Sequence, residues 1–196
     1  MTRTPPLPVG KFAVIYADPP WAWGKAPLVD RGAARAVEKE YPTMQPDELE
    51  RLPVGNLAAA DCALFLWTTG PKLKVGLTVL SAWGFDYKTI GFVWAKQNRK
   101  SEGFFMGMGF YTRANAELCL IGTRGSPKRL DAGVSQLVVA PVGEHSAKPR
   151  EVRKRIERLF AGPRIELFAR EHAEGWQSWG LEVNERLDAP PQLWPA

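Results

Sequence analysis

The chain has 196 residues, 45% of them hydrophobic, with a formal net charge of +5 and a pI near 9.3; this suits one globular domain and allows a polyanionic partner. No apolar run approaches the ~20 residues of a membrane span, the first ten residues lack a signal peptide's apolar core, and two histidines without clustered cysteines argue against a zinc site. We therefore expect a cytoplasmic protein that needs no metal and no membrane, with Cys62 and Cys119 as buried free thiols.

The first predicted element is a buried strand over Phe12–Ala17, six mostly apolar residues. It ends at Asp18, because Pro19 and Pro20 cannot continue the hydrogen bonding of a sheet. A carboxylate, two prolines and Trp21 therefore stand at the carboxyl end of a strand, where open α/β sheets bind their ligands.

This corner suits the methylation of an exocyclic adenine amine, whose delocalised lone pair makes it a poor nucleophile. The Asp18 carboxylate and a carbonyl of Pro19 or Pro20 can each accept one N–H and aim the lone pair at a methyl sulfonium. Trp21 offers a stacking surface for a base taken out of its helix. The alternative is a strand that ends in a proline turn beside one core tryptophan.

Residues 22–40 lack periodicity and contain four basic side chains, so we expect a mobile basic loop over the active site, with a solvated linker as the alternative. Strand and helix patterns then alternate, which predicts a mainly parallel sheet. The expected elements are a helix from Pro46, a strand over Ala63–Thr68, a helix over Leu73–Trp83 that ends at Gly84, and strands over Thr89–Lys96, Glu117–Thr123 and Leu137–Ala140.

Residues 97–113 break this alternation and combine basic with apolar side chains. Arg99 and Lys100 can neutralise phosphates, while aromatic rings such as Phe104 and Tyr111 can stack on unpaired bases. The segment is therefore our candidate for contact with a nucleic-acid target. A hydrophobic flap that packs on the protein or on a partner subunit is an equal alternative.

The last third of the chain begins with a helix after Lys148-Pro149, with an apolar stripe of Val152, Ile156, Leu159 and Phe160. Its many arginines are the pattern of a solvated face. A strand follows over Arg164–Arg170, residues 176–183 return to the sheet, and the end of the chain is loose. We expect one domain over residues 1–186 and a tail over 187–196.

Several blocks in this order resemble one family. They are Asp18-Pro19-Pro20-Trp21, Tyr41-Pro42-Thr43-Met44, Leu64-Phe65-Leu66-Trp67, Glu117-Leu118-Cys119-Leu120, Lys148-Pro149 and Ile165-Glu166-Leu167-Phe168-Ala169-Arg170. The chain resembles, from about Gly10 to Val183, the MT-A family of amino-methyltransferases, named for the seventy-kilodalton catalytic subunit of the messenger-RNA adenine-N6 methyltransferase. The resemblance implies a Rossmann-like methyltransferase fold, with helices on both faces of the sheet, and S-adenosylmethionine as cofactor.

The resemblance also implies roles for single residues. Lys148 would bind the methionine carboxylate of the cofactor, Asp18 would also contact the cofactor, and Phe168, Arg170 and His172 match its other contacts. We expect Glu182 to bind the ribose, because a carboxylate can accept from both hydroxyls. Tyr41 would help to close the substrate pocket, and Glu117 would lie near the site. The alternatives are that Phe168 only packs in the core, that His172 is a residue of a surface loop, and that Glu117 is an ordinary surface acid.

Two features depart from the family. Leu181 stands where relatives commonly have Asn, and only eleven residues precede the first strand, so we expect a weaker grip on the cofactor's adenine. The expected activity is methylation of the N6 amine of adenine in nucleic acid, with DNA favoured and RNA as the first alternative. A non-catalytic subunit and a small-molecule methyltransferase are the rivals, and the resemblance leaves open a homodimer or a partner subunit.

Overall fold

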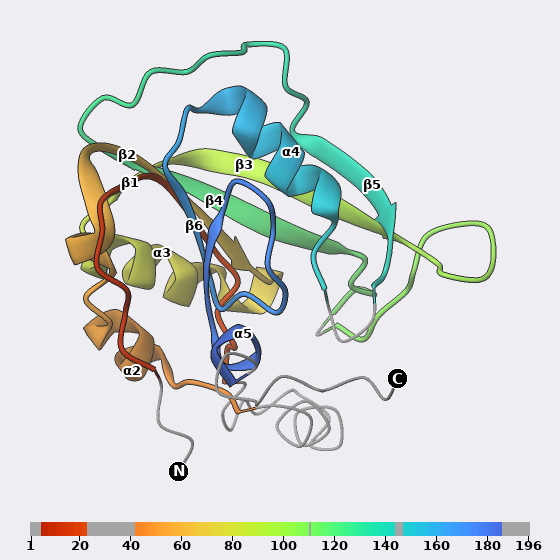
Figure 1. Cartoon of the computed structure of the whole chain (residues 1–196). Helices are drawn as coiled ribbons and strands as arrows, with labels where there is room; N and C mark the ends of the chain where they lie inside the picture. The colour runs from red at the N-terminus through yellow and green to blue at the C-terminus, as the bar shows by residue number, and fades with distance from the viewer. Residues whose placement is uncertain (1–4, 23–41, 110, 144–146, 186–196) are drawn as a thin grey trace, which may run out of the picture.

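The computed structural model describes residues 5–22, 42–109, 111–143 and 147–185, and its centre is a seven-stranded sheet with the order β5-β3-β4-β2-β1-β6-β7 (Figure 1). The strands are β1 (Phe12–Ala17), β2 (Ala58–Thr68), β3 (Asp86–Gln97), β4 (Ala116–Arg124), β5 (Leu137–Pro141), β6 (Arg164–Leu167) and β7 (Gln177–Trp179). The helices are α2 (Pro46–Arg51), α3 (Leu73–Ala82), α4 (Arg150–Leu159), α5 (Leu181–Glu185) and the 3₁₀ turns η1 (Val54–Leu57) and η2 (Gly70–Lys72). Only the pairs that involve β4 are antiparallel among these strands, which confirms an α/β protein with a mainly parallel sheet.

The two faces of the sheet are buried by different helices, with α4 on one face and α2 and α3 on the other (Figure 1). Successive side chains of a strand point to opposite faces, so Ile15 packs in the cluster with α2 and α3 while Val14 and Tyr16 pack in the cluster with α4. The core of β2 is buried on both faces, as its unbroken apolar run predicts.

One edge of the sheet gathers most of the predicted site. β1, β2, β3, β5 and β6 run in the same direction and end at this edge, whereas the antiparallel β4 begins there. Asp18 directly follows β1, Glu117 lies at the start of β4, and Lys148 lies between β5 and α4. Residues that are 130 positions apart in the chain are thus brought to one corner.

Most predicted elements are present, with two corrections at the end of the chain. The last long strand was predicted over Arg164–Arg170, but β6 ends at Leu167 because Phe168 adopts a left-handed conformation with φ 61°. Residues 176–183 were predicted to return to the sheet, but only Gln177–Trp179 form a strand, β7, and α5 begins at Leu181. The segments 23–41, including Tyr41, and 186–196 lie outside the described residues.

Gly180 lets β7 approach the turn after β6. The amide of Ala169 donates to the Trp179 carbonyl at 2.9 Å, and a Cβ on Gly180 would lie 2.4 Å from the Ala169 oxygen. We expect Gly180→Ala to lower the free energy of unfolding by about 3 kcal/mol, because the backbone must shift. Urea denaturation measures this change. Gly70→Ala is the control, since a Cβ there meets nothing within 4 Å, and an equal loss in both variants would contradict the close-approach argument.

The two cysteines, Cys62 and Cys119, are free and buried, which confirms the expectation of buried thiols. In the described ranges, no helix combines the length and apolarity needed to cross a membrane.

Candidate functional site

The corner after β1 is held by hydrogen bonds to the segment before α2. The Pro20 carbonyl accepts the Met44 N–H at 2.8 Å, and the Ala22 N–H donates to the Met44 carbonyl at 3.0 Å. The Trp21 N–H donates to the Pro19 carbonyl at 2.9 Å. Each proline carbonyl therefore already accepts one bond, and the second lone pair of each oxygen is the one that a ligand N–H would use.

The ring of Trp21 lies in the core on the α2 and α3 side of the sheet. The residue is 8% exposed, and its indole N–H donates to the Trp67 carbonyl at 3.1 Å. In this arrangement the indole anchors the corner and presents little surface to a ligand. Stacking of Trp21 on a base remains a prediction, and the alternative of a core tryptophan describes its surroundings here.

Four charged side chains form an alternating cluster at this edge. Lys148 Nζ lies 2.7 Å from Asp18 Oδ2 and 3.3 Å from Glu117 Oε2, and Lys96 donates a short hydrogen bond to Glu117 Oε1. The side chains are only 11–23% exposed. Two carboxylates and two ammonium groups compensate each other, so the cluster is close to neutral as a whole.

Burial and neighbouring charges set the protonation of this cluster. Burial raises the pKa of Asp18 above its usual value, although the Lys148 ammonium opposes the change. Burial acts the same way on Glu117, but Lys148 and Lys96 outweigh it and lower the pKa of that carboxyl. Burial alone would lower the pKa of Lys148, yet Asp18 and Glu117 raise it. Asp18 is thus the carboxylate of the pair that accepts a proton more readily.

Two tryptophans lie beneath the ammonium groups. Lys148 Nζ is 5.6 Å from the centroid of the Trp67 ring, and Lys96 Nζ is 5.0 Å from that of Trp94. The Trp67 indole also donates to the hydroxyl of Tyr16 at 2.7 Å. Trp67 therefore connects the strand β1, the corner tryptophan and Lys148, and the cations gain cation–π attraction in a partly desolvated site.

Three predicted cofactor residues lie after β6 and β7, the two strands that continue the sheet from β1. Phe168 follows β6, and its ring packs edge-on against Trp179 at 5.3 Å. The Arg170 guanidinium lies 3.8 Å from Glu182 Oε1, and its charge adds to that of Lys148 in opposing the rise that burial causes in the pKa of Asp18. Glu182 is 52% exposed, which leaves its carboxylate accessible to a ligand. The remaining cofactor prediction, His172, is exposed on the loop after β6.

The predicted substrate residues divide between the corner and a projecting segment. Glu117 is in the charged cluster and makes two ion pairs, so it is not an ordinary surface acid. Arg99 and Lys100 are exposed beyond the end of β3. The apolar side chains of that segment are also exposed, so the alternative that the described part of this flap packs on its own protein is wrong.

Sequence reasoning missed Lys96 and the ion pairs of α4. The signal for Lys96 was its place at the end of an apolar strand, at the edge that contains Asp18. Arg153, which was assigned to a solvated helix face, is 13% exposed and pairs with Glu166 at 2.8 Å and with Glu171. Burial raises the pKa of Glu166 despite Arg153. These pairs attach α4 to β6 near the site.

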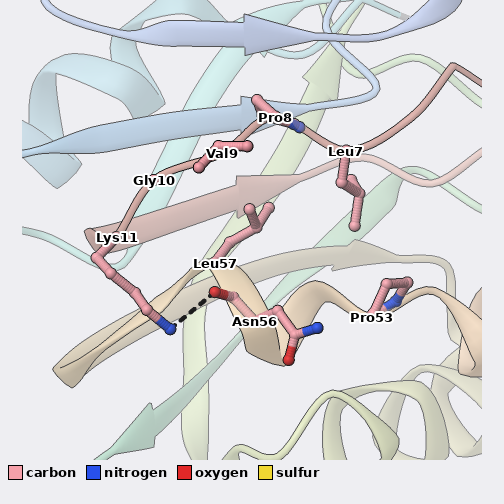
Figure 2. A pocket seen from close by; sticks show the side chains of 8 residues that line it. All are labelled: Leu7, Pro8, Val9, Gly10, Lys11, Pro53, Asn56 and Leu57. Atoms are coloured by element: carbon pink, nitrogen blue, oxygen red, sulfur yellow. Dashed lines mark hydrogen bonds between the residues drawn. The ribbon is translucent and has the colours of Figure 1, made fainter.

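A cavity of about 540 Å³ lies elsewhere, between the segment before β1 and η1 (Figure 2). Its lining is Leu7, Pro8, Val9, Gly10, Lys11, Pro53, Asn56 and Leu57, and Lys11 Nζ donates to the Asn56 carbonyl at 2.9 Å across it (Figure 2). Lys11 and Leu57 directly precede β1 and β2, so this cavity is at the amino edge of the sheet, opposite Asp18. It contains none of the predicted site residues.

The charged corner fits S-adenosylmethionine by the chemistry of its side chains. Lys148 and Arg170 are cations suited to the carboxylate of the methionine part, and Glu182 is an accessible acceptor suited to ribose hydroxyls. Because Gly180 has no side chain, the ends of β6 and β7 lie close together on this side.

Comparison with known proteins agrees with this geometry. Residues 12–182 match the MT-A70 family model. The chain is 36% identical over 205 residues to the type II methyltransferase M.MunI of Mycoplasma sp, with 96% of this chain and 85% of that protein covered. It is also 36% identical to the human N(6)-adenosine-methyltransferase catalytic subunit METTL3 and to a Drosophila melanogaster MT-A70-like protein; 90% and 94% of this chain match, but it spans 29% of either relative. The chain belongs to the MT-A70 family.

Proposed function

We propose that this protein is a Rossmann-like methyltransferase that transfers a methyl group from S-adenosylmethionine to the N6 amine of adenine in nucleic acid. The observation that supports it most is the largely buried carboxylate of Asp18, which stands at a strand end directly before two prolines and pairs with Lys148. Relatives named as methyltransferases, two of them for the N6 position of adenosine, support the same reaction.

In this proposal the corner makes a weak nucleophile reactive. Asp18 accepts one N–H of the adenine amine, and the carbonyl of Pro19 or Pro20 accepts the other. Lys148 holds the Asp18 carboxylate and Met44 holds the Pro20 carbonyl, so little reorganisation is needed as charge develops. When bound, S-adenosylmethionine supplies an electrophilic methyl group on its sulfonium.

The other site residues bind and orient. Lys148 and Arg170, with Phe168, His172 and Glu182, bind the carboxylate and the ribose of the cofactor. Trp21 and Tyr41 form part of the pocket for the adenine base. Glu117 positions Lys148 through their ion pair. The methylated amine is acidic and loses its surplus proton to Asp18 or to water. The raised pKa of Asp18 suits that acceptor role.

We favour DNA over RNA. The relatives named for adenosine, the ribonucleoside, are matched over only 29% of their length, whereas the chain spans 85% of the type II methyltransferase M.MunI. RNA is the alternative. Arg99 and Lys100 would contact phosphates in either polymer. The proposed location of the enzyme is the cytoplasm.

The test offers labelled S-adenosylmethionine to single-stranded DNA, duplex DNA and RNA of one sequence, each with an adenine-free counterpart. We expect label in the adenine-containing DNA and none in the counterparts. Transfer to RNA alone would favour the alternative polymer. Binding of the cofactor by calorimetry without transfer to any polymer would contradict the proposal and favour a non-catalytic subunit.

A further inference from the structure

A projecting segment, which we call the wing (residues 98–109 and 111–115), begins beside the candidate site. It connects β3 to β4 beyond the carboxyl edge and extends away from the sheet in Figure 1. The Lys96 carbonyl accepts the Phe105 N–H and the Lys96 N–H donates to the Asn115 carbonyl, both at 2.8 Å. The side chain of this same lysine binds Glu117, so the root of the wing is one residue away from the charged cluster.

The wing has a defined backbone. The Asn98 N–H donates to the Gly103 carbonyl at 3.1 Å, and the Gly107 N–H donates to the Ala114 carbonyl at 2.8 Å, so the chain turns back twice. The Arg113 guanidinium donates to the carbonyls of Met106 and Gly107 at 2.7 and 2.8 Å. The wing thus fixes its backbone with its own polar groups, and its apolar side chains are left outward.

The exposed surface of the wing combines apolar faces with positive charge. Its large apolar side chains are 36–92% exposed, and they are Phe104, Phe105, Met106, Met108 and Tyr111. Arg99 and Lys100 are exposed among them, and Glu102 is the one acid against three basic residues in the described part of the wing. Aromatic faces beside basic groups are the surface that proteins use for unpaired strands, since the faces of paired bases are covered by stacking.

We propose that the wing binds an unpaired nucleic-acid strand, with bases stacked on Phe104, Phe105 and Tyr111 and phosphates at Arg99 and Lys100. The identity of the occupant as a nucleic acid rests on the proposed function. A second copy of this chain is a poorer occupant, because two wings that face each other would bring like charges together. The substrate of the enzyme is then single-stranded, or is opened beside the target adenine.

The first test measures binding of a fluorescent oligonucleotide, single-stranded or duplex, to the wild type and to a Phe104→Ala/Tyr111→Ala variant. The wild type is expected to prefer the single strand, and the variant to lose about tenfold of that affinity while its duplex affinity changes less than twofold. Tyr87→Ala is the matched control, because this aromatic residue is 43% exposed at the start of β3, at the opposite edge. Equal affinity of the wild type for both forms, or unchanged single-strand binding by the variant, would overturn the proposal.

Salt dependence tests the phosphate contacts separately. Arg99→Gln and Lys100→Gln are each expected to reduce the slope of log K against log salt by about 0.7 on the single strand. An unchanged slope in both variants would remove these residues from the interface. Sedimentation of the free protein tests whether the wing is instead an interface between two copies of the chain. The inference is overturned if a wing variant no longer dimerises but binds the single strand as the wild type does.

Failure of this inference is distinguishable from failure of the proposed function. If the wild type and the wing variant transfer methyl groups to single strands with the same KM, the proposed role of the wing is contradicted and the proposed reaction stands. Wing-dependent strand binding without methyl transfer to any polymer contradicts the reaction and leaves the wing intact. With both correct, the variant raises KM and keeps kcat.

Discussion

Asp18→Asn is expected to lower kcat for methyl transfer by about two to three orders of magnitude, the usual cost of removing one preorganised polar group that acts in the transition state. Asparagine keeps the size of the side chain, but its amide lacks the negative charge that orients the amine and increases its nucleophilicity. Because the lost interaction strengthens only as the amine reacts, kcat and kcat/KM are expected to fall together, with KM for the oligonucleotide little changed. Steady-state assays at saturating cofactor measure both constants.

The control for this variant is Asp47→Asn. Asp47 is 59% exposed on α2 and pairs with Arg51, so its carboxylate is solvated and is not a member of the charged cluster. It is expected to retain the wild-type rate. An Asp18→Asn protein that is folded by circular dichroism, binds the cofactor and keeps at least half of the wild-type kcat would remove the mechanism.

Lys148→Met is expected to destabilise the protein by about 3 kcal/mol and to abolish measurable cofactor binding, because removal of one partner leaves buried charge uncompensated. Lys148 is 11% exposed and is the ammonium that contacts both Asp18 and Glu117. Its loss brings two carboxylates together without a cation between them. Urea denaturation measures the stability, and calorimetry with S-adenosylmethionine measures the binding.

Lys154→Met is the matched control for this lysine, since Lys154 is exposed on α4. It is expected to match the wild type in both measurements. Lys148→Arg separates charge from shape: it is expected to recover most of the stability but less of the cofactor binding, because a planar guanidinium does not replace a compact ammonium. Wild-type stability in Lys148→Met would contradict the central place of this residue in the cluster.

The pH dependence of kcat reports on Asp18. The carboxylate must be ionised to accept the amine N–H, and its pKa is raised by burial, so activity is lost on acidification at a higher pH than the value of about 4 expected for a free aspartate. The Lys96→Met variant removes one of the two ammonium groups that lower the pKa of Glu117. A less ionised Glu117 repels the Asp18 carboxylate less, so the acid limb of that variant is expected to move to lower pH. A pH profile identical to that of the wild type would show that Lys96 is not coupled to the corner.

The sequence predicted the elements whose signals are local. The apolar run before Asp18, the proline at the start of α2 and the glycine after α3 each mark an element boundary within one or two residues of the structure. The β6 boundary was missed because the positive φ of Phe168 is unusual for a bulky residue, and its sequence has no glycine there to indicate it. The helix at Leu181 is short and depends on packing against β7, which periodicity does not reveal.

The sequence predicted the residues of the candidate site better than the contacts between them. Asp18, Glu117 and Lys148 were each identified, but the ion pairs that join them cross 130 and 31 positions of the chain and have no sequence signal. Lys96 has a signal in its place at the end of an apolar strand, but its ion pair with Glu117, 21 residues away, has none. Trp21 was predicted to stack on a base, whereas its ring lies in the core in the structure; an aromatic residue at a strand end suits both places.

The most direct measurement is nucleoside mass spectrometry of adenine-containing DNA after incubation with the wild-type protein and S-adenosylmethionine. Ring nitrogens of adenine are the stronger nucleophiles, so methylation of the exocyclic amine requires the activation that we assign to Asp18 and the proline carbonyls. The account predicts N6-methyl-2′-deoxyadenosine as the single methylated nucleoside. Recovery of the methyl group on a ring nitrogen or on another base would contradict it.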